Sequence, residues 1–147
     1  MSEFNPAFWV WGHQASQPRV LHTMVRVRQL DRALAFYGDG LGMKVLNRYD
    51  FEQGRFSIVF MAYEGYAQGG AIELTCNWDQ ADDYSHGSGY GHLSVGVPDI
   101  EAMVARLEQF GGTATVRPKP QAPGAPLLAF VKDPDGYAIE LIQTCRH

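Results

Sequence analysis

Two histidines and two glutamates stand at matching places in the chain. Glu73 follows His22 by 51 positions, and Glu140 follows His92 by 48. Each lies in a short segment in which apolar and polar residues alternate, and this alternation predicts a β-strand whose successive side chains lie on opposite faces. Each predicted strand places its His or Glu on the face opposite its apolar residues. The four side chains are therefore candidates for one shared site.

The chemistry of this set points to a borderline divalent cation. Imidazole nitrogens favour Zn, Ni, Co or Fe, and carboxylates tolerate these ions and Mn. Because no thiolate joins the set and the four residues are far apart in sequence, a closed structural zinc site is disfavoured. A single His on a sheet is more often structural, and a strand Glu more often faces solvent. The repetition of all four in phase favours an open, catalytic metal site.

The elements that must position these residues form an internal repeat. When His22 is aligned with His92, Leu30 falls on Ile100 and Leu34 falls on Val104. Both halves predict a strand, a helix and three further strands, so the expected fold is α+β, with two tandem βαβββ modules. We expect open, barrel-like mixed sheets with the helices outside. One such module is too small to bury a core well alone, and pairing of the modules is therefore expected.

The predicted organisation follows from this repeat. It comprises an N-terminal extension at 1–20, a first module at 21–78, a linker at 79–90, a second module at 91–143 and a C-terminal tail at 144–147. Alternation predicts strands at 21–27, 44–48, 55–63, 70–77, 91–97, 113–116, 127–132 and 137–143. Helices are expected at 30–37 and from Pro98-Asp99 to Gly111-Gly112, and a Pro-rich loop is expected at 118–126.

Composition excludes several classes of function. The chain has 12 Lys and Arg against 16 Asp and Glu, a net charge of −4, which is unlike a nucleic-acid-binding protein. No segment approaches the ~20 apolar residues of a membrane span. Two cysteines, Cys76 and Cys145, make no disulfide framework, and no basic leader opens the chain. We therefore expect a cytoplasmic protein without a membrane or nucleic-acid partner.

Several residues outside the four have simpler interpretations. Cys76 lies on the apolar side of its predicted strand and is expected to pack in the core, and Cys145 is expected to be inert. The remaining histidines are expected at the surface; they are His13, His86 and His147. The aromatic residues of the extension (Phe8, Trp9 and Trp11) belong either to a flexible terminus or to an arm that docks on another surface.

Five groups of segments add a resemblance to a known family. They are 20–27; 36–37 with 41–43; 72–75 with 77–78; 90–92; and 133–137 with 139–141. Together they resemble the glyoxalase I family, within the vicinal oxygen chelate superfamily, over about 20–143. The combination Glu73-Leu74-Thr75 with Asn77-Trp78 is specific, since the wider superfamily shares the fold but seldom these residues.

This resemblance implies an activity and an assembly. The activity is that of a lactoylglutathione lyase, which isomerises the hemithioacetal of methylglyoxal and glutathione to S-lactoylglutathione and so detoxifies 2-oxoaldehydes. The assembly is a homodimer in which the first module of one chain meets the second module of the other. The four metal ligands, His22, Glu73, His92 and Glu140, would then complete one site at each interface.

The resemblance also implies a role for individual residues. Glu140 is the expected base that moves a proton between two neighbouring carbons through an enediolate, and Glu73 is a second proton carrier or a plain ligand. A divalent cation stabilises the enediolate as a Lewis acid. His at position 22 and the short connection between the modules resemble bacterial members that favour Ni(II) or Co(II) over Zn(II). Arg26, Asn77 and Ser88 match positions that hold glutathione.

One departure from the family pattern concerns the thiol. Relatives tend to carry a lysine in the Gly-rich loop before the strand at 127–132, whereas this chain has Arg117 and Lys119 several residues earlier. Three alternatives follow. Arg117 and Lys119 take over the role of the loop lysine, or the thiol conjugate is bound differently, or the thiol is not glutathione. The alternatives are another metalloenzyme of the same fold (an extradiol dioxygenase, an epimerase or a thiol transferase) and a metal-free drug-binding protein.

Overall fold

The computed structural model describes residues 18–66 and 69–144, which divide into two compact units. Unit 1 consists of the described residues up to 30 and within 42–84, and unit 2 consists of 31–41 and the described residues from 85 onward. The aromatic residues of the extension and His13, Cys145 and His147 lie outside the described residues.

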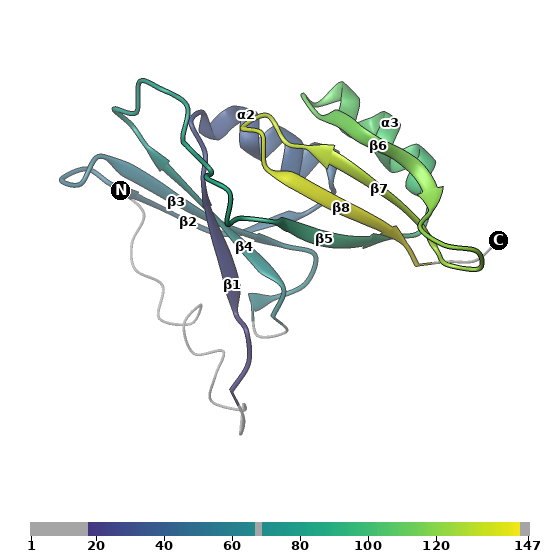
Figure 1. Ribbon diagram of the computed structural model, residues 1–147. Coiled ribbons are helices and arrows are strands. Elements are labelled where there is room, and N and C mark those ends of the chain that lie inside the picture. Colours follow the sequence, from purple (N-terminus) through teal and green to yellow (C-terminus); the bar gives the residue numbers. More distant parts are fainter. Residues whose placement is uncertain (1–17, 67–68, 145–147) are drawn as a thin grey trace. The chain divides into compact units, whose positions relative to one another are not determined.

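Unit 1 is a four-stranded mixed sheet with the order β1-β4-β3-β2 (Figure 1). Its strands are β1 (His22–Arg26), β2 (Lys44–Phe51), β3 (Phe56–Ala62) and β4 (Ala71–Asn77). β1 pairs in parallel with β4, and the other two pairings are antiparallel. Val25, Val27 and Leu74 are buried on the face opposite His22 and Glu73, as the alternation predicts. Cys76 is buried too, in agreement with its expected packing role.

Unit 2 repeats this topology with the order β5-β8-β7-β6. Its strands are β5 (His92–Val97), β6 (Thr113–Pro120), β7 (Leu127–Lys132) and β8 (Ala138–Gln143). β5 pairs in parallel with β8. The two equivalent four-stranded mixed sheets confirm the α+β fold that the internal repeat predicts.

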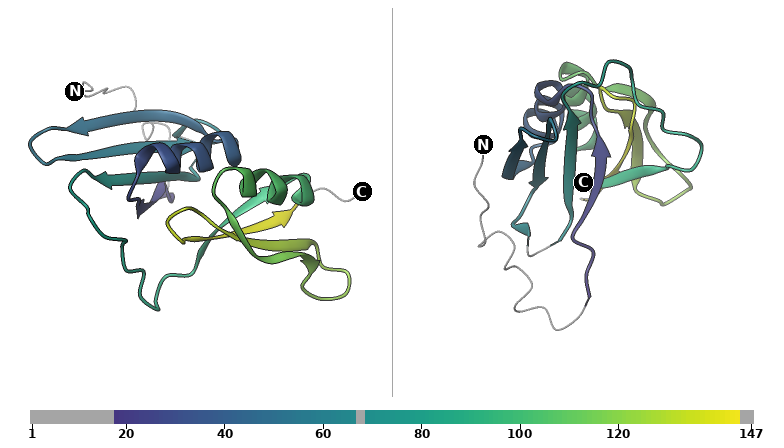
Figure 2. Two further views of the ribbon diagram at one scale, coloured as in Figure 1. Left: turned by 90° about the horizontal axis from the view of Figure 1, so that it is seen from above. Right: turned by 90° about the vertical axis from the view of Figure 1, so that its left-hand side faces the viewer.

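Three helical segments of the described residues bear on the core, and all are short. They are α2 (Leu30–Leu34), the π-helical segment η2 (Ala35–Gly40) and α3 (Ile100–Gln109). η2 and α3 lie beside each other within unit 2 (Figure 2), where Gly40 permits close contact: a Cβ atom at this position would lie 3.0 Å from Leu107 Cδ2. The expected helix at 30–37 is thus an α-helix at its start and a wider π-helix from Ala35 onward.

The module boundaries inferred from the repeat stay a prediction.

α3 begins and ends where the sequence predicts. The Asp99 side chain caps its start by accepting a hydrogen bond from the Ala102 amide at 3.1 Å. Gly111 follows its end with φ of 89°, a conformation that favours glycine. None of the helices in the described part of the chain is long and apolar enough to cross a membrane.

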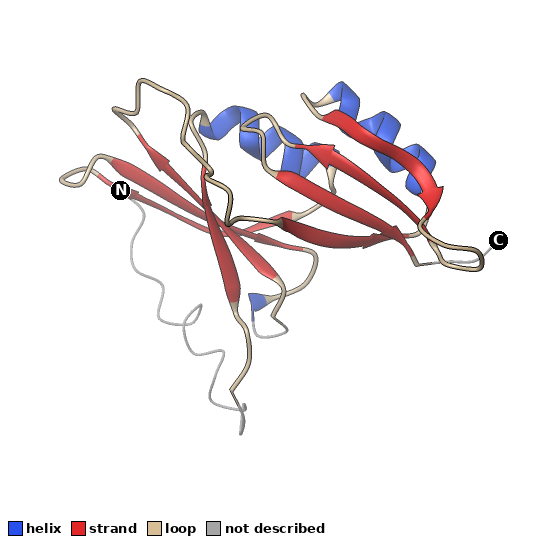
Figure 3. Ribbon diagram, in the orientation of Figure 1, coloured by secondary structure: helices blue, strands red, loops and turns tan. Residues whose placement is uncertain are grey.

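The expected loop at 118–126 is wrong at its start. β6 continues through Pro118 to Pro120 before the chain turns toward β7 (Figure 3). β6 is an edge strand, so a proline there leaves no inter-strand hydrogen bond unmade on its outer side. Register shifts between Ala114 and Val116 and between Val116 and Lys119 show where the strand departs from simple alternation.

Candidate metal centre

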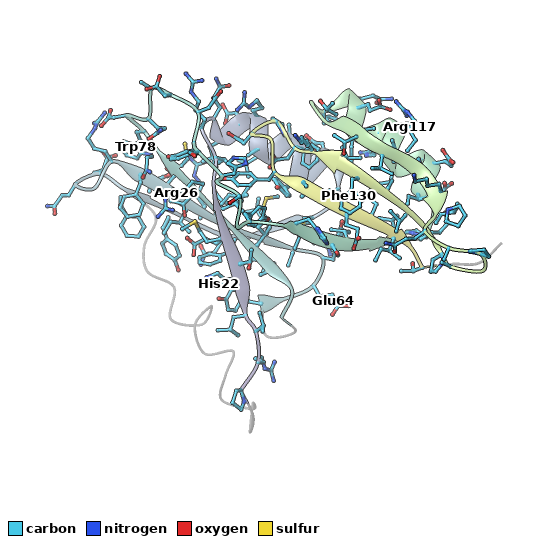
Figure 4. The ribbon with its side chains drawn as sticks, in the orientation of Figure 1. His22, Arg26, Glu64, Trp78, Arg117 and Phe130 are labelled. Carbon is cyan, nitrogen blue, oxygen red and sulfur yellow. The ribbon has the colours of Figure 1, made fainter. Side chains whose placement is uncertain are left out.

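The first candidate pair lies on the face of the unit 1 sheet that is opposite Val25 and Leu74. Met24 is opposite Glu73 in the parallel register of β1 and β4, which places His22 and Glu73 diagonally across the two strands. His22 Nε2 lies 3.2 Å from Glu73 Oε1. The two side chains are 28% and 15% exposed, so both remain accessible from one side. Figure 4 shows His22 and Arg26 projecting from β1.

The His22 ring is held on its other edge. Its Nδ1 hydrogen-bonds with the hydroxyl of Tyr66, which follows β3 and is only 5% exposed. Phe60 of β3 contacts the same ring edge-on, with centroids 5.2 Å apart and planes at 74°. Burial, and then the negative charge of Glu73, raise the pKa of the Tyr66 phenol above its usual value, so its hydroxyl stays protonated at neutral pH.

The Glu73 carboxylate is held as well. Thr75 Oγ1, two residues further along β4, donates to Glu73 Oε2 at 2.7 Å. Residues two apart in a strand share a face, so the alternation that identifies Glu73 also places Thr75 beside it. One carboxylate oxygen is thereby tied to Thr75, and the other is turned toward His22.

The second pair has the same register in unit 2. Ser94 of β5 is opposite Glu140 of β8, and His92 Nε2 lies 3.6 Å from Glu140 Oε1. Ser94 Oγ donates to that same oxygen at 2.6 Å. Phe130 of β7 contacts the His92 ring edge-on at 5.2 Å, as Phe60 does for His22. At 40% and 18%, the exposed fractions of the two side chains exceed those of the first pair.

Each unit supplies donor atoms of the kind that the implied cation binds, but too few of them to hold it alone. Each unit presents one imidazole nitrogen and one carboxylate on a single face, which is the chemistry that a borderline divalent ion accepts. Among residues 18–66 and 69–144, no cluster of three or more His, Cys, Asp or Glu side chains could hold an ion. Two donors are too few for a protein-bound ion of this kind, which takes at least three protein ligands. Each unit thus presents two of the four predicted ligands.

The predicted thiol contacts divide between the units. Arg26 of β1 is opposite Thr75, and Asn77 ends β4 on the same face, so both follow Glu73 along the sheet. Asn77 Nδ2 donates to the Tyr84 hydroxyl at 2.9 Å. Ser88 is exposed in the segment that leads into β5 and belongs to unit 2.

The two displaced basic residues lie in different surroundings. Arg117 pairs with Glu108 of α3 through both guanidinium nitrogens, at 2.8 and 3.2 Å (Arg117 is labelled in Figure 4). Lys119 is opposite Leu128, which is two residues from Phe130 on β7. Directly paired residues share a face of the sheet, so Lys119 lies on the face that carries Glu140.

A buried turn at Asp133 leads into β8, the strand that carries Glu140. Asp133 accepts hydrogen bonds from the amides of Asp135 and Tyr137 at 2.9 Å each and from the Tyr37 hydroxyl at 2.7 Å. Burial raises the pKa of the Asp133 carboxyl, while these hydrogen bonds lower it, and the balance is an increase. Burial, and then the charge of Asp133, raise the pKa of Tyr37 well above its usual value.

One expectation near this turn is met only in part. His86 is expected at the surface; its side chain is half-buried, and its ring stacks on Tyr137 with centroids 4.0 Å apart and planes at 7°. Its Nε2 atom is buried. An aromatic partner 51 positions away cannot be recognised from local sequence, and this contact fixes the start of the segment that carries Ser88.

Comparison with known proteins identifies the class of this fold and site. The sequence profile of the Glyoxalase/Bleomycin resistance protein/Dioxygenase superfamily matches residues 19–141. The chain belongs to this superfamily, as its resemblance to the glyoxalase I family predicts.

Particular relatives narrow the class. The chain is 45% identical over 125 residues to a probable lactoylglutathione lyase of Synechocystis sp., covering 85% of this chain and 95% of that protein. The crystal structure of glyoxalase I from Zea mays matches with a TM-score of 0.81 and 34% identity over 87% of this chain. The chain spans 45% of the length of that maize protein.

A third relative differs in its thiol. A trypanothione-dependent glyoxalase I from Leishmania major matches with a TM-score of 0.74 and 38% identity, covering 86% of this chain and 87% of that one. The relatives that share this fold with appreciable sequence identity therefore include enzymes named for more than one thiol.

Proposed function

We propose that this protein is a metal-dependent lactoylglutathione lyase, which isomerises the hemithioacetal of methylglyoxal and glutathione to S-lactoylglutathione. The observation that carries the proposal is the repeated pair: a His and a Glu with the same parallel-strand register in both sheets. Relatives named lactoylglutathione lyase and glyoxalase I support the same activity.

The proposed metal ligands are His22 and Glu73 of unit 1 with His92 and Glu140 of unit 2. When bound, a divalent cation supplies Lewis-acid stabilisation of the negative charge that develops on two adjacent substrate oxygens. Ni(II) or Co(II) is the proposed ion and Zn(II) is the alternative, because the His at position 22 resembles bacterial members of the family.

The carboxylates of Glu140 and Glu73 are the candidates for proton transfer. The reaction removes a proton from the carbon that bears the thiol and returns one to the neighbouring carbon, so one group must accept it and give it back. We assign this role to Glu140. Its Oε1 accepts from Ser94, and within residues 18–66 and 69–144 its Oε2 has no hydrogen-bond donor. Glu73, whose Oε2 accepts from Thr75 and whose Oε1 lies beside His22 Nε2, has a partner for both oxygens and is the better fixed ligand and the second candidate for proton transfer.

The proposed assembly is a homodimer with two sites at its interface. Within residues 18–66 and 69–144, no cluster of three or more candidate ligands occurs, so the proposed four-ligand site needs a pair from unit 1 and a pair from unit 2. In the proposed dimer, unit 1 of one chain meets unit 2 of the other. Arg26 and Asn77 would then reach the glutathione part from one chain, and Ser88 from the other.

A mixing experiment tests this assembly. His22→Ala and His92→Ala are each expected to be inactive. When the two variants are unfolded, mixed and refolded together, heterodimers regain one intact site, and about a quarter of the wild-type activity returns. Refolding each variant alone is the control. A mixture that stays inactive, although heterodimers are demonstrated by mass spectrometry, would show that the site is not shared in this way.

The activity itself is tested on the purified chain. After loading with Ni(II), Co(II) or Zn(II), the protein should form the thioester from methylglyoxal and glutathione, measured by thioester absorbance. Stoichiometric metal binding without activity would favour another metalloenzyme of the fold, such as an epimerase or a thiol transferase. Failure to bind any of these ions would favour a metal-free binding protein.

The thiol is part of the same proposal. Glutathione carries carboxylates, and Arg26 with Lys119 offers cationic partners for them on the ligand-bearing faces of the two sheets. The trypanothione-dependent relative makes the comparison of glutathione with trypanothione informative, because the two thiols differ in carboxylate charge. A cytoplasmic location, where glutathione is abundant, is proposed with it.

A further inference from the structure

The inference concerns Tyr66, a residue that no alternating pattern identifies. Its hydroxyl meets His22 Nδ1, the nitrogen of the ring that does not face Glu73. The phenol is buried in an apolar cluster with Tyr49, Phe60, Ala62 and Ala71. Its ring packs against Phe60 with centroids 5.6 Å apart and planes at 88°, and its backbone carbonyl accepts from the Gly69 amide at 3.0 Å.

The second half-site lacks this contact. His92 has the equivalent register and the equivalent edge-on phenylalanine, but within the described residues its Nδ1 has no hydrogen-bond partner. The hydrogen bond is therefore a particular addition to His22 and not a consequence of the repeated topology.

The donor and acceptor roles at Nδ1 decide what Nε2 can do. A neutral imidazole carries its proton on one nitrogen, and only the other nitrogen has a lone pair to offer. With the proton on Nε2, that atom donates toward Glu73 Oε1, 3.2 Å away, and Nδ1 accepts from the Tyr66 hydroxyl. With the proton on Nδ1, the ring donates to the Tyr66 oxygen, and the Nε2 lone pair is available to a cation.

We propose that Tyr66 is a positioning residue for the metal ligand His22, and that its hydroxyl serves both tautomers of the ring. This inference rests on the proposed function, because it assumes that His22 is a ligand. A hydroxyl both donates and accepts, so reversing the hydrogen bond requires no movement of the ring. A hydrogen-bond partner of this kind fixes the orientation of a ligating imidazole and raises its affinity for the metal.

The test is the metal affinity of Tyr66→Phe, measured by competition with a chromophoric chelator for Co(II) and Zn(II). The variant keeps the ring packing and loses only the hydroxyl. We expect its dissociation constant to rise by about 10-fold or more. Tyr49→Phe is the matched control, because Tyr49 lies in the same cluster and its hydroxyl accepts from Asn47 at 2.9 Å instead of from a ligand. This control should bind metal as the wild type does.

A second measurement reports the tautomer directly. Long-range ¹H–¹⁵N spectra of ¹⁵N-histidine-labelled protein should show His22, assigned with His22→Gln, protonated at Nε2 without metal and at Nδ1 with Zn(II). Tyr66→Phe should keep Nε2 protonation in the metal-free protein, because Glu73 Oε1 still accepts from that atom, and it should lose the acceptor for the Nδ1 proton when Zn(II) is bound.

The outcomes separate this inference from the proposed function. If Tyr66→Phe binds metal as tightly as the wild type, Tyr66 has only a packing role and the inference is overturned, while the function stands. If wild-type His22 stays protonated at Nε2 with Zn(II) bound, the exchange of tautomers is overturned as well. If the wild type binds no metal, both are overturned. If Tyr49→Phe weakens binding equally, the effect belongs to the cluster and the inference is overturned.

Discussion

The two His–Glu pairs share one strand register, but unit 1 holds both members of its pair and unit 2 holds only the carboxylate, within the residues that the structure describes. In unit 1 a hydrogen bond fixes the imidazole at Nδ1, and Thr75 ties down the far oxygen of Glu73. In unit 2 Ser94 binds the carboxylate oxygen nearest the imidazole, and the His92 side chain is more exposed. The repeated topology therefore produces one anchored half-site and one looser half-site. Both oxygens of Glu73 have a partner, whereas Glu140 Oε2 has no hydrogen-bond donor among the described residues, and this difference supports Glu140 as the proposed base.

The largest expected effect distinguishes the two glutamates. Glu140→Gln removes the proposed base, and turnover should fall by about 10²–10⁴-fold while most of the metal is kept. Glu73→Gln should lose metal affinity more than Glu140→Gln does and should lose less turnover per bound ion. The measurements are kcat and metal content of the two variants side by side. Equal losses of turnover would mean that the two half-sites share the proton transfer.

The next effect concerns the buried hydrogen bond between Tyr37 and Asp133 in unit 2. Tyr37→Phe removes a donor from the buried Asp133 carboxylate and should cost about 2 kcal/mol in free energy of unfolding, measured with urea. Because the folded-state pKa of Tyr37 is raised, its contribution is complete below about pH 10 and is lost as the pH rises further. The wild type should therefore lose its advantage over Tyr37→Phe at strongly alkaline pH. An advantage that stays constant from pH 8 to 11 would argue against a raised pKa.

A third comparison tests the two basic residues of β6. Lys119→Ala should raise KM for the glutathione adduct by about 10-fold with little change in kcat, since a charged hydrogen bond to a carboxylate is lost. Arg117→Ala is the matched control, because Arg117 pairs with Glu108 and should leave KM unchanged. If the control variant raises KM more than Lys119→Ala, the thiol approaches from the α3 side.

The smallest effects concern the two hydroxyls that hold the carboxylates. Ser94→Ala and Thr75→Val each remove one hydrogen bond of about 1 kcal/mol, so changes of a few-fold are expected. We expect Ser94→Ala to change kcat and Thr75→Val to change metal affinity. The two measurements are turnover at saturating metal and chelator competition. Interchanged effects would assign the anchored half-site to unit 2.

Much of the fold and the candidate ligands could be predicted because strand geometry has a strict period. Once 71–77 is a strand, Glu73 and Thr75 must share a face, and the repeat transfers the same argument to Glu140. Their ligand role is still a prediction, since each sheet by itself brings together one His and one Glu.

The contacts that escape prediction come from segments without a period. Tyr66 lies between β3 and β4, outside any alternating segment, so its contact with His22 follows from no period in the sequence. Lys119 could not be placed on a face because the register shifts in β6 break the alternation, and the prolines around it predict a loop. His86 and Tyr137 are 51 positions apart in sequence, and their rings come into contact when the chain folds.

The position of residues 31–41 has a consequence for how the chain folds. This segment belongs to unit 2, and its Tyr37 meets Asp133 across 96 positions of sequence. Phe36 and Tyr37 are fully buried in the folded protein. During translation they are synthesised long before partners such as Asp133. Contacts of such long sequence separation slow folding. The early helical segment must wait through the synthesis of three strands of the other unit, and a fragment that starts at residue 85 would lack part of its own core.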